Sequence, residues 1–499
     1  MDQRQRLRSV GIFAGYMLAA VVICMVLGWF AARITTNRLL DDANRRLARV
    51  ETGRSLWQWH LHKPRDLIAG RAFGHAALAH NDDTLRITSQ DGTPFELGLP
   101  VEDALDLAHW PILQVQLESS APGTLGLIWG SDLTPTCQIA VASALTPDTR
   151  TLRIDLRSLR WQPVGASQCP APGVARMLRL TLQIPASASA QLTSAALLTT
   201  EPMMPAPGTA IDLPSGHVEQ AFVRGGNQAM PWFRLPHGLS AENMLSLRDQ
   251  LLARWPGALI LPAGATPQAS PPISRTTLWW IACVLYLVAL AWLAARPIKG
   301  PPRAWLEITG CLLGPLWLVI GLHWGLYPTA LGILAFGGGL AYAFFIERRH
   351  LPRLWRWPTT GRDWLWPSLT VPVTLVLIAT RGHALHPLPL GHVLTYFAWA
   401  WLQQWLMLIV LLPRVEQMTR HRTAPSIIAV ALLFALLHTP NGMLMQLCFI
   451  AELWWAWCFR RSRSVLPIGL AHAACALLVE SGLVGGLVRS LEVSARFFL

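Results

Sequence analysis

The sequence AWLQQWLMLIVLL, Ala400–Leu412, is an apolar run that two adjacent amides interrupt, Gln403 and Gln404. Two later apolar runs each contain an imidazole side chain, at His438 and His472. A polar side chain at bilayer depth is costly, so it usually faces the inside of a helical bundle and often marks a site. This part of the chain therefore predicts both a membrane bundle and the place of its functional residues.

Apolar runs of membrane-spanning length recur along the chain. Hydrophobic residues make up 52% of its 499 residues and charged residues only 14%, which is typical of a membrane protein with a soluble part. Residues 10–32 contain no charge and are long enough to cross a bilayer. The further apolar runs are at residues 277–295, 304–323, 327–346, 364–381, 392–412, 425–441, 443–458 and 465–486. The pattern predicts a polytopic α-helical membrane bundle of about nine spans.

A different periodicity follows the first span. Apolar and polar residues alternate in several short segments of residues 70–201, such as Leu178-Arg-Leu180-Thr-Leu182, and turn residues separate these segments. Such alternation predicts an inserted all-β sandwich, here of jelly-roll-like type. The expected domains are an N-terminal membrane anchor at 1–33, a stalk at 34–69, the sandwich at 70–201, a Pro-rich connection with one short helix at 202–276, membrane helices at 277–389 and a membrane core at 390–487.

Charge placement predicts the orientation of the chain. Lys and Arg gather in alternate loops between the apolar runs, which by the positive-inside rule gives a cytoplasmic N-terminus. Residues 34–276 are then extracytoplasmic, and the protein is a multi-pass protein of the inner (plasma) membrane. The net charge of +13 lies largely in loops beside apolar runs, so the lipid bilayer is the expected partner and nucleic acid is not.

Two of the eight cysteines, Cys137 and Cys169, fall in the β-sandwich region. The other six lie in or beside apolar runs, where a free cysteine behaves as a small buried residue. Disulfides form in oxidising compartments. If the sandwich is extracytoplasmic, Cys137 and Cys169 could pair.

The final four spans resemble the CPBP family of CAAX proteases and bacteriocin-processing intramembrane metalloproteases, also called Abi. That family has two adjacent glutamates with an arginine four positions after the second, then Phe-x-x-x-His, then His-x-x-x-Asn. Phe434-Ala-Leu-Leu-His438 matches the second motif, and the stretch from Arg461 to His472 resembles the approach to the third. The resemblance covers roughly residues 390–487 and implies an intramembrane protease fold there.

The sequence departs from the family at four motif positions. Gln403 and Gln404 stand where the glutamates belong, Leu408 where the arginine belongs and Ala476 where the asparagine belongs. In the family a glutamate is thought to activate water. A glutamine cannot accept a proton as a carboxylate can, and loss of one general base costs about 10²–10⁴ in rate. The resemblance therefore supports the fold better than the activity.

The resemblance also implies a cofactor and a substrate. His438 and His472 are the positions that would organise zinc or another divalent metal. Glu452 and Glu480 are the remaining carboxylates within the spans, and either could serve as a substitute base. The implied substrate is a membrane-anchored protein or peptide.

Three functions remain open. The first is a CPBP-type intramembrane endopeptidase, either active or with reduced or lost activity, that acts on a membrane-associated peptide or protein. The second is a non-catalytic pseudoprotease, a scaffold of the cell envelope. The third is an envelope polysaccharide-handling protein whose sandwich binds a glycan, since β-sandwich surfaces can bind sugars through exposed aromatic side chains; this last prediction rests on fold analogy.

Overall fold

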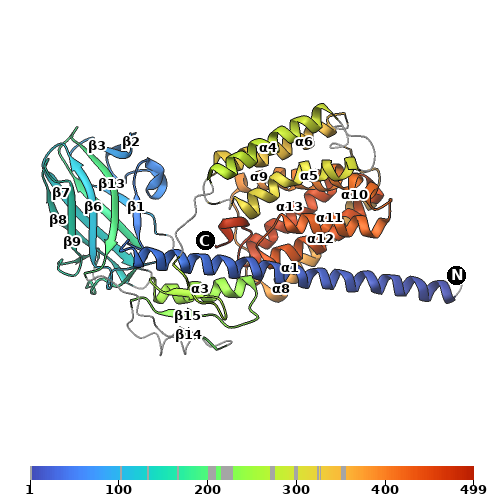
Figure 1. Ribbon diagram of the computed structural model, residues 1–499, viewed down its shortest axis with the longest axis horizontal. Helices are drawn as coiled ribbons and strands as arrows, with labels where there is room; N and C mark the ends of the chain where they lie inside the picture. The colour runs from blue at the N-terminus through green and yellow to red at the C-terminus, as the bar shows by residue number, and fades with distance from the viewer. Residues whose placement is uncertain are drawn as a thin grey trace. The chain divides into compact units, whose positions relative to one another are not determined.

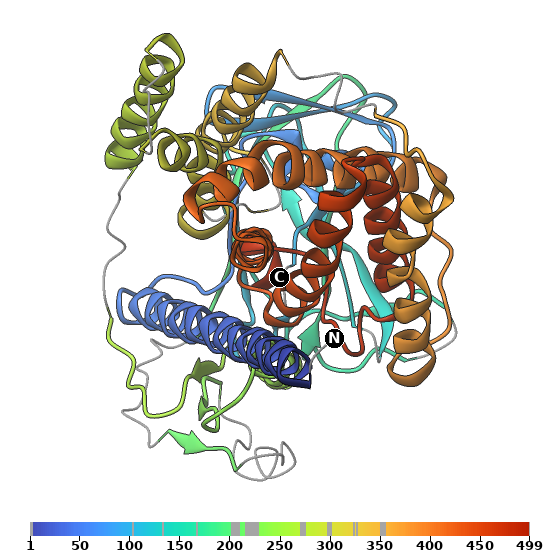
Figure 2. The ribbon, with the colours of Figure 1, turned by 90° about the vertical axis from the view of Figure 1, so that its right-hand side faces the viewer.

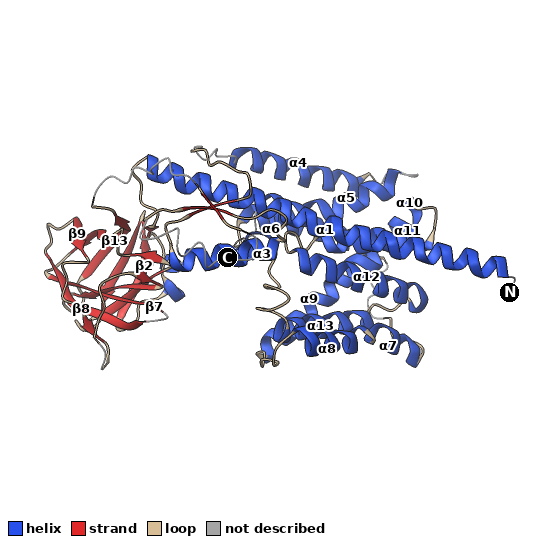
Figure 3. Cartoon of the chain, turned by 90° about the horizontal axis from the view of Figure 1, so that it is seen from below, coloured by secondary structure: helices blue, strands red, loops and turns tan. Residues whose placement is uncertain are grey.

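The structure is a computed structural model that describes residues 3–101, 104–131, 134–165, 168–200, 210–214, 229–269, 276–296, 302–322, 325, 328–349 and 356–498. It divides into two compact units. The membrane unit comprises Met1–Thr36, Leu239–Asn243 and Ile273–Leu499, and the β unit comprises Asn37–Gly238 and Met244–Pro272. In Figure 3 the strands gather in the β unit and long helices make up the membrane unit.

The first helix, α1, runs from Gln3 to Glu51. The predicted anchor and the first half of the predicted stalk therefore belong to one helix. Ala43 and Leu47 lie one turn apart on α1, and both are buried in an apolar cluster with Leu259 and Leu261. The i, i+4 spacing of the two side chains is what brings them to the same face.

Two antiparallel sheets form the β unit's main body, which confirms the predicted β-domain. One sheet has the order β2-β3-β13-β6-β9, with β1 also paired to β13, and the other has the order β10-β8-β7-β12-β4. The strands of these two sheets are β1 (Gln58–His60), β2 (Ala76–Asn81), β3 (Thr84–Ser89), β4 (Phe95–Leu99), β6 (Ile112–Ser119), β7 (Gly123–Ser131), β8 (Thr134–Leu145), β9 (Thr151–Asp155), β10 (Gln162–Pro163), β12 (Met177–Gln183) and β13 (Ser189–Leu198). A separate two-stranded sheet pairs β5 (Leu105–Asp106) with β11 (Val174–Ala175). Because β1 pairs with β13, the sandwich begins before residue 70, the boundary expected from the sequence.

Alternate residues of these strands fill one apolar core. On β12, Leu178, Leu180 and Leu182 are fully buried, while the residues between them face outward. Trp110 and Trp129 belong to the same core. The period-two pattern of the sequence thus corresponds to one buried face on each sheet.

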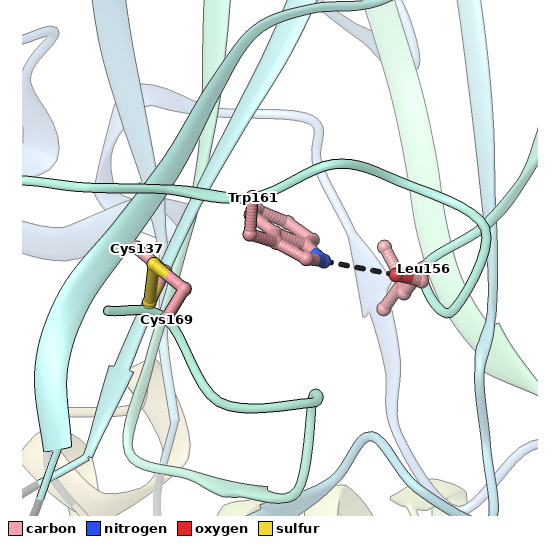
Figure 4. Close-up of a disulfide and its surroundings, with 4 residues drawn as sticks. All are labelled: Cys137, Leu156, Trp161 and Cys169. Atoms are coloured by element: carbon pink, nitrogen blue, oxygen red, sulfur yellow. Dashed lines mark hydrogen bonds between the residues drawn. A yellow bond between two sulfur atoms is a disulfide. The ribbon is translucent and has the colours of Figure 1, made fainter.

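A disulfide ties the loop after β10 to strand β8. It joins Cys137 on β8 to Cys169, 32 residues later (Figure 4). In the same region the indole Nε1 of Trp161 donates to the backbone oxygen of Leu156 over 2.9 Å. The disulfide and the indole hydrogen bond both hold this loop-rich segment to the sandwich.

The connection after the sandwich contains more structure than the sequence suggests. Helix α3, Ala241–Arg254, occupies the range expected for the short helix. A three-stranded parallel sheet of β14 (Ile211–Asp212), β15 (Trp232–Arg234) and β16 (Leu259–Leu261) is also present, and no alternation in the sequence predicted it.

The membrane unit is a bundle of apolar helices (Figures 1 and 2). Its helices after α1 are α4 (Thr276–Ala295), α5 (Pro302–Leu316), α6 (Ala330–Glu347), α7 (Gly361–Ser368), α8 (Thr370–Arg381), α9 (Leu390–Gln404), α10 (Leu412–Met418), α11 (Thr423–Leu436), α12 (Gly442–Ser462) and α13 (Leu466–Gly482), with π-helical η3 (Trp317–Gly321) after α5. Among the described residues, seven helical stretches are long and apolar enough to cross a bilayer, and α11 and α13 are shorter apolar helices. The prediction of a multi-pass membrane protein is confirmed.

Candidate functional site

The two amides of the opening sequence lie where α9 changes its helical geometry. Helix α9 ends at Gln404, and a π-helical segment, η5 (Trp405–Leu411), follows before α10 begins. Every residue of η5 is buried. Short π-helical segments are rare and often occur at functional sites. Gln403 is half-buried and Gln404 fully buried, so the pair lies inside the bundle.

Gln404 contacts side chains of two other helices. Its Nε2 donates to Glu452 Oε2 on α12 over 2.9 Å and to His472 Nδ1 on α13 over 3.3 Å. Glu452 is 0% exposed and His472 is 5% exposed. Within the described part of the chain, Gln404 Oε1 and Glu452 Oε1 have no hydrogen-bond partner. The structure thus brings three of the sequence-predicted site residues into one buried polar cluster.

His438 reaches the same region through the ring of Phe434. The imidazole Nδ1–H of His438 donates to the backbone oxygen of Phe434 over 2.9 Å. The Phe434 ring lies 4.8 Å from the His438 ring and 5.5 Å from the His472 ring, in edge-on contact with both. Phe434 on α11 therefore contacts both His438, in the turn just after α11, and His472.

A cavity of about 910 Å³ opens beside this cluster. Gln403, His438 and His472 contribute to its wall, together with many apolar side chains of the bundle. Gln404 and Glu452 are not among its lining residues. The site therefore has a cavity wall with two imidazoles and an amide, and a buried amide–carboxyl pair behind that wall.

The second predicted carboxylate, Glu480, lies on the wall of the same cavity. It accepts a hydrogen bond at Oε2 from His392 Nε2 over 2.9 Å. His392 stands near the start of α9 and Glu480 near the end of α13, about three turns from Gln403 and two turns from His472 respectively. This pair is thus a second polar group on the cavity wall, separate from the Gln404 cluster.

The segment that follows α13 folds back along the cavity. Its residues Ser490, Leu491, Glu492, Val493 and Arg496 line the cavity wall. Asn441 holds the segment: its Nδ2 donates to Ser490 O over 2.6 Å and to Glu492 O over 3.3 Å. Ser494 N donates to Thr439 O over 2.9 Å. We call residues 484–498 the strap, because these hydrogen bonds hold it beside His438.

The side chains present do not fit the divalent metal that the family resemblance implies. Among the described residues, no group of three or more His, Cys, Asp or Glu side chains is placed to hold a metal ion. Of the two predicted ligands, His472 Nδ1 already accepts from Gln404 and His438 Nδ1 donates to Phe434. A catalytic zinc site takes three protein ligands and keeps one open position.

Several functional features went unseen in the sequence. Glu452 could be recognised as a carboxylate within a span, but nothing in the sequence pointed to Gln404 as its partner. His392 carried no signal beyond its place in a histidine-containing loop. The strap follows the last predicted span, and nothing in the sequence indicated that Asn441, at the start of α12, would hold it.

The C-terminal region has recognisable relatives. Residues 385–478 match the family described as type II CAAX prenyl endopeptidase Rce1-like. The match contains Gln403, Gln404, Glu452, His438 and His472 and ends two residues before Glu480. It confirms the resemblance that the motifs of this region indicated, a CAAX-protease-like domain in the C-terminal part of a multi-pass membrane protein.

The β unit is similar to solved carbohydrate-binding modules only at a low level. One is a low-affinity xylan-binding module from the gut symbiont Roseburia intestinalis, with a TM-score of 0.20, 11% identity and coverage of 29% of this chain and 95% of that one. Another is a family 11 module of a cellulosomal cellulase from Clostridium thermocellum, with a TM-score of 0.21, 14% identity and coverage of 26% and 83%. Such values say nothing about what this β unit binds. No curated protein matches the chain.

Proposed function

We propose that this CAAX-protease-like membrane protein binds an apolar, membrane-associated peptide segment in its intramembrane cavity and does not cleave it. The observation that carries the proposal is the position of the carboxyl groups. The family's two glutamates are replaced by Gln403 and Gln404, and the nearest carboxyl, Glu452, is sealed behind the cavity wall. A general base must reach the proton that it removes, directly or through one water.

The cavity itself supports binding. Its volume of about 910 Å³ lies within the range of about 300–1,000 Å³ that is usual for ligand sites. Leucine, valine and tryptophan side chains make up much of the wall, while Gln403, His438 and His472 supply a few polar groups. A peptide segment rich in apolar side chains would be complementary to this wall, and the polar groups could hydrogen-bond its backbone.

The experiment measures proteolysis in liposomes that contain the purified full-length chain and apolar membrane peptides. We expect no cleavage by the wild type, and none by the variant that carries both Gln403→Glu and Gln404→Glu. Gain of cleavage on restoring the glutamates would show instead a peptidase impaired only by those two changes. His438→Ala in the restored background is the matched control, because it removes an imidazole from the cavity wall.

One observation favours the catalytic alternative. Glu480, unlike Glu452, lines the cavity, and its partner His392 holds it at 2.9 Å. A carboxylate paired with an imidazole is an arrangement that can act as a general base. This alternative predicts cleavage of a membrane peptide by the wild type, lost on Glu480→Gln; cleavage that the Glu480→Gln variant retained would contradict it.

Glycan binding by the β unit has no structural observation in its favour. All five tryptophans between residues 57 and 161 are buried or half-buried. The indole N–H of the half-buried Trp161 already donates a hydrogen bond to the backbone oxygen of Leu156. Sugar-binding sandwiches use exposed aromatic side chains. A glycan array probed with the full-length chain tests this third function directly.

We also propose an orientation of the chain in the membrane. The positive-inside pattern and the Cys137–Cys169 disulfide both support an extracytoplasmic β unit and a cytoplasmic N-terminus, because disulfides persist in oxidising compartments. Reporter fusions placed after α3, within the β unit, and in the 419–422 loop would test it, since opposite sides of the inner membrane are expected to give opposite signals.

A further inference from the structure

The cavity can hold only part of a membrane-crossing segment. A helix with its side chains is about 10–12 Å wide and rises about 1.5 Å per residue, so 910 Å³ holds roughly five to eight helical residues. A helix that crosses a bilayer needs about 20 residues. A peptide bound in the cavity as proposed above would therefore place one of its ends there, and the charged groups of the cavity wall decide which end.

Three charged side chains line the cavity: Glu480, Glu492 and Arg496. Glu492 and Arg496 face each other, with 3.6 Å between a carboxylate oxygen and a guanidinium nitrogen, so their charges offset each other. Glu480 has the imidazole of His392 as its partner instead. With neutral imidazoles the cavity wall carries a net charge of −1, and the uncompensated carboxylate is Glu480.

The His392–Glu480 pair presents two acceptors to the cavity. The hydrogen bond between them uses His392 Nε2 and Glu480 Oε2. This hydrogen bond uses neither His392 Nδ1 nor Glu480 Oε1, so both atoms can accept a further hydrogen bond. The ring of Tyr396 lies 6.0 Å from the His392 ring, one turn along α9, and also lines the cavity. A carboxylate, an imidazole acceptor and an aromatic face together are complementary to a cationic donor.

We infer that His392, Glu480 and Tyr396 form a subsite for a primary ammonium group, the free amino terminus of an apolar peptide. This inference rests on the proposed function, because it takes the cavity's ligand to be a peptide. The ammonium donates to Glu480 and to His392 and lies near the ring of Tyr396. A peptide's terminal carboxylate is disfavoured at the same place by the charge of Glu480.

The test uses the full-length chain in phosphatidylcholine nanodiscs and two octapeptides of leucine and alanine. Both peptides carry a dansyl group and an amide at the C-terminal end; one has a free amino terminus and the other is acetylated. Energy transfer from tryptophan to dansyl reports binding, since Trp399 and Trp454 line the cavity. We expect the peptide with the free amino terminus to bind about tenfold more tightly than the acetylated one, because one charge-assisted hydrogen bond is worth about that factor in affinity.

Matched variants separate the subsite from the charge of the cavity as a whole. Glu480→Gln removes one negative charge at the subsite and is expected to reduce the tenfold preference to about one. Glu492→Gln removes the same charge elsewhere on the wall and is expected to keep the preference. Tyr396→Leu, which leaves both acceptors in place, is expected to lower the preference about threefold.

Each other outcome has a definite meaning. Equal binding of the two peptides would overturn the subsite and leave the proposed function standing, whereas binding of neither would overturn both. Loss of the preference in Glu492→Gln as well as in Glu480→Gln would reduce the subsite to a general charge effect. A last outcome is that phosphatidylethanolamine, used in place of phosphatidylcholine, displaces the peptide with the free amino terminus. The subsite would then bind the ammonium group of a lipid, and the peptide assignment would be overturned.

Discussion

The Arg179–Glu96 pair of the β-sandwich is partly open to water, whereas the charged group around Arg414 lies inside the membrane bundle. In the sandwich, Arg179 pairs with Glu96 over 2.8 Å, and both side chains are about one third exposed. In the bundle, Arg414 lies between Glu307 and Glu347, with all three side chains less than a tenth exposed. Water can hydrate the first kind of pair if it breaks, but nothing replaces the partner in the second kind.

This difference in exposure corresponds to a difference in what stabilises each unit. The sandwich has one large apolar core, so its stability comes largely from apolar burial, with one disulfide in addition. The bundle instead includes buried polar groups that position helices: the Arg414 group links α10 to α5 and α6, and the Gln404 cluster links α9 to α12 and α13. The proposed function therefore depends on polar contacts that also hold the bundle together.

The largest expected effect is that of removing Arg414. The change Arg414→Leu leaves Glu307 and Glu347 buried without their shared cation, and we expect a loss of about 3–5 kcal/mol of unfolding free energy. Reversible unfolding in mixed detergent micelles measures it. Arg157→Leu in the sandwich is the matched control, because Arg157 pairs with Asp155 on the surface, and its loss is expected to change the stability far less than Arg414→Leu does. Equal effects of the two changes would contradict the comparison.

The next effect tests the sandwich itself. Cys137→Ser removes the disulfide that closes a segment of 32 residues, and we expect the β unit to lose about 3 kcal/mol of unfolding free energy. Protease susceptibility of the β unit in the full chain, measured along a urea titration, reports this loss. The change is expected to leave the bundle's unfolding unchanged, and a shift of the bundle by the same amount would show that the two units do not unfold independently.

The sequence predicted both folds because each rests on a strong local period. Alternating leucines such as Leu178, Leu180 and Leu182 could only be buried as a strand, and charge-free runs of about 20 residues could only be spans. The parallel sheet β14-β15-β16 escaped notice because its strands are two or three residues long, too short for a period to appear. The order of its strands depends on pairing between residues that lie far apart in the sequence.

The candidate site was only partly predictable for the same reason. His438 stood out because its motif lies within one helical turn, and Gln404 because an amide is unusual in a span. The contact of Gln404 with Glu452 joins residues 48 positions apart, and that of His392 with Glu480 joins residues 88 apart. Sequence shows that such polar groups need partners. It does not show which partner the bundle provides.

A smaller effect is expected at the strap. Asn441 is fully buried, donates to two strap carbonyls and accepts from Leu444 N at the start of α12. Asn441→Ala removes the helix cap and both strap hydrogen bonds, so we expect a loss of about 1–2 kcal/mol. We also expect faster labelling of Cys448, which lines the cavity, by a water-soluble thiol reagent. Asn441→Ser keeps a side-chain oxygen that can cap α12 and removes the amide donor, so it is expected to label faster while losing less stability; unchanged labelling in both variants would contradict a covering role for the strap.

The smallest expected effect concerns Asp91 in the turn between β3 and β4. Hydrogen bonds from the Thr93 hydroxyl and backbone, with a smaller contribution from His75, lower the pKa of Asp91 from 3.8 to about 2. Because the folded-state pKa lies below the unfolded one, the stabilisation is complete above pH 3.8 and is lost as the pH falls toward and through 2. Pepsin cleavage of the β unit in the full chain, compared from pH 4 to pH 2, measures that loss.

The matched variant for Asp91 is Thr93→Ala, which removes the hydroxyl donor but leaves the backbone donor in place. It is expected to bring the pKa of Asp91 part of the way back toward 3.8, so that acid destabilisation begins at a higher pH than in the wild type. The effect stays small because Asp91 is exposed and water replaces the lost hydrogen bond. A large change from this surface turn, comparable with that of Arg414→Leu, would mean that solvent access does not separate the polar pairs of the sandwich from those of the bundle.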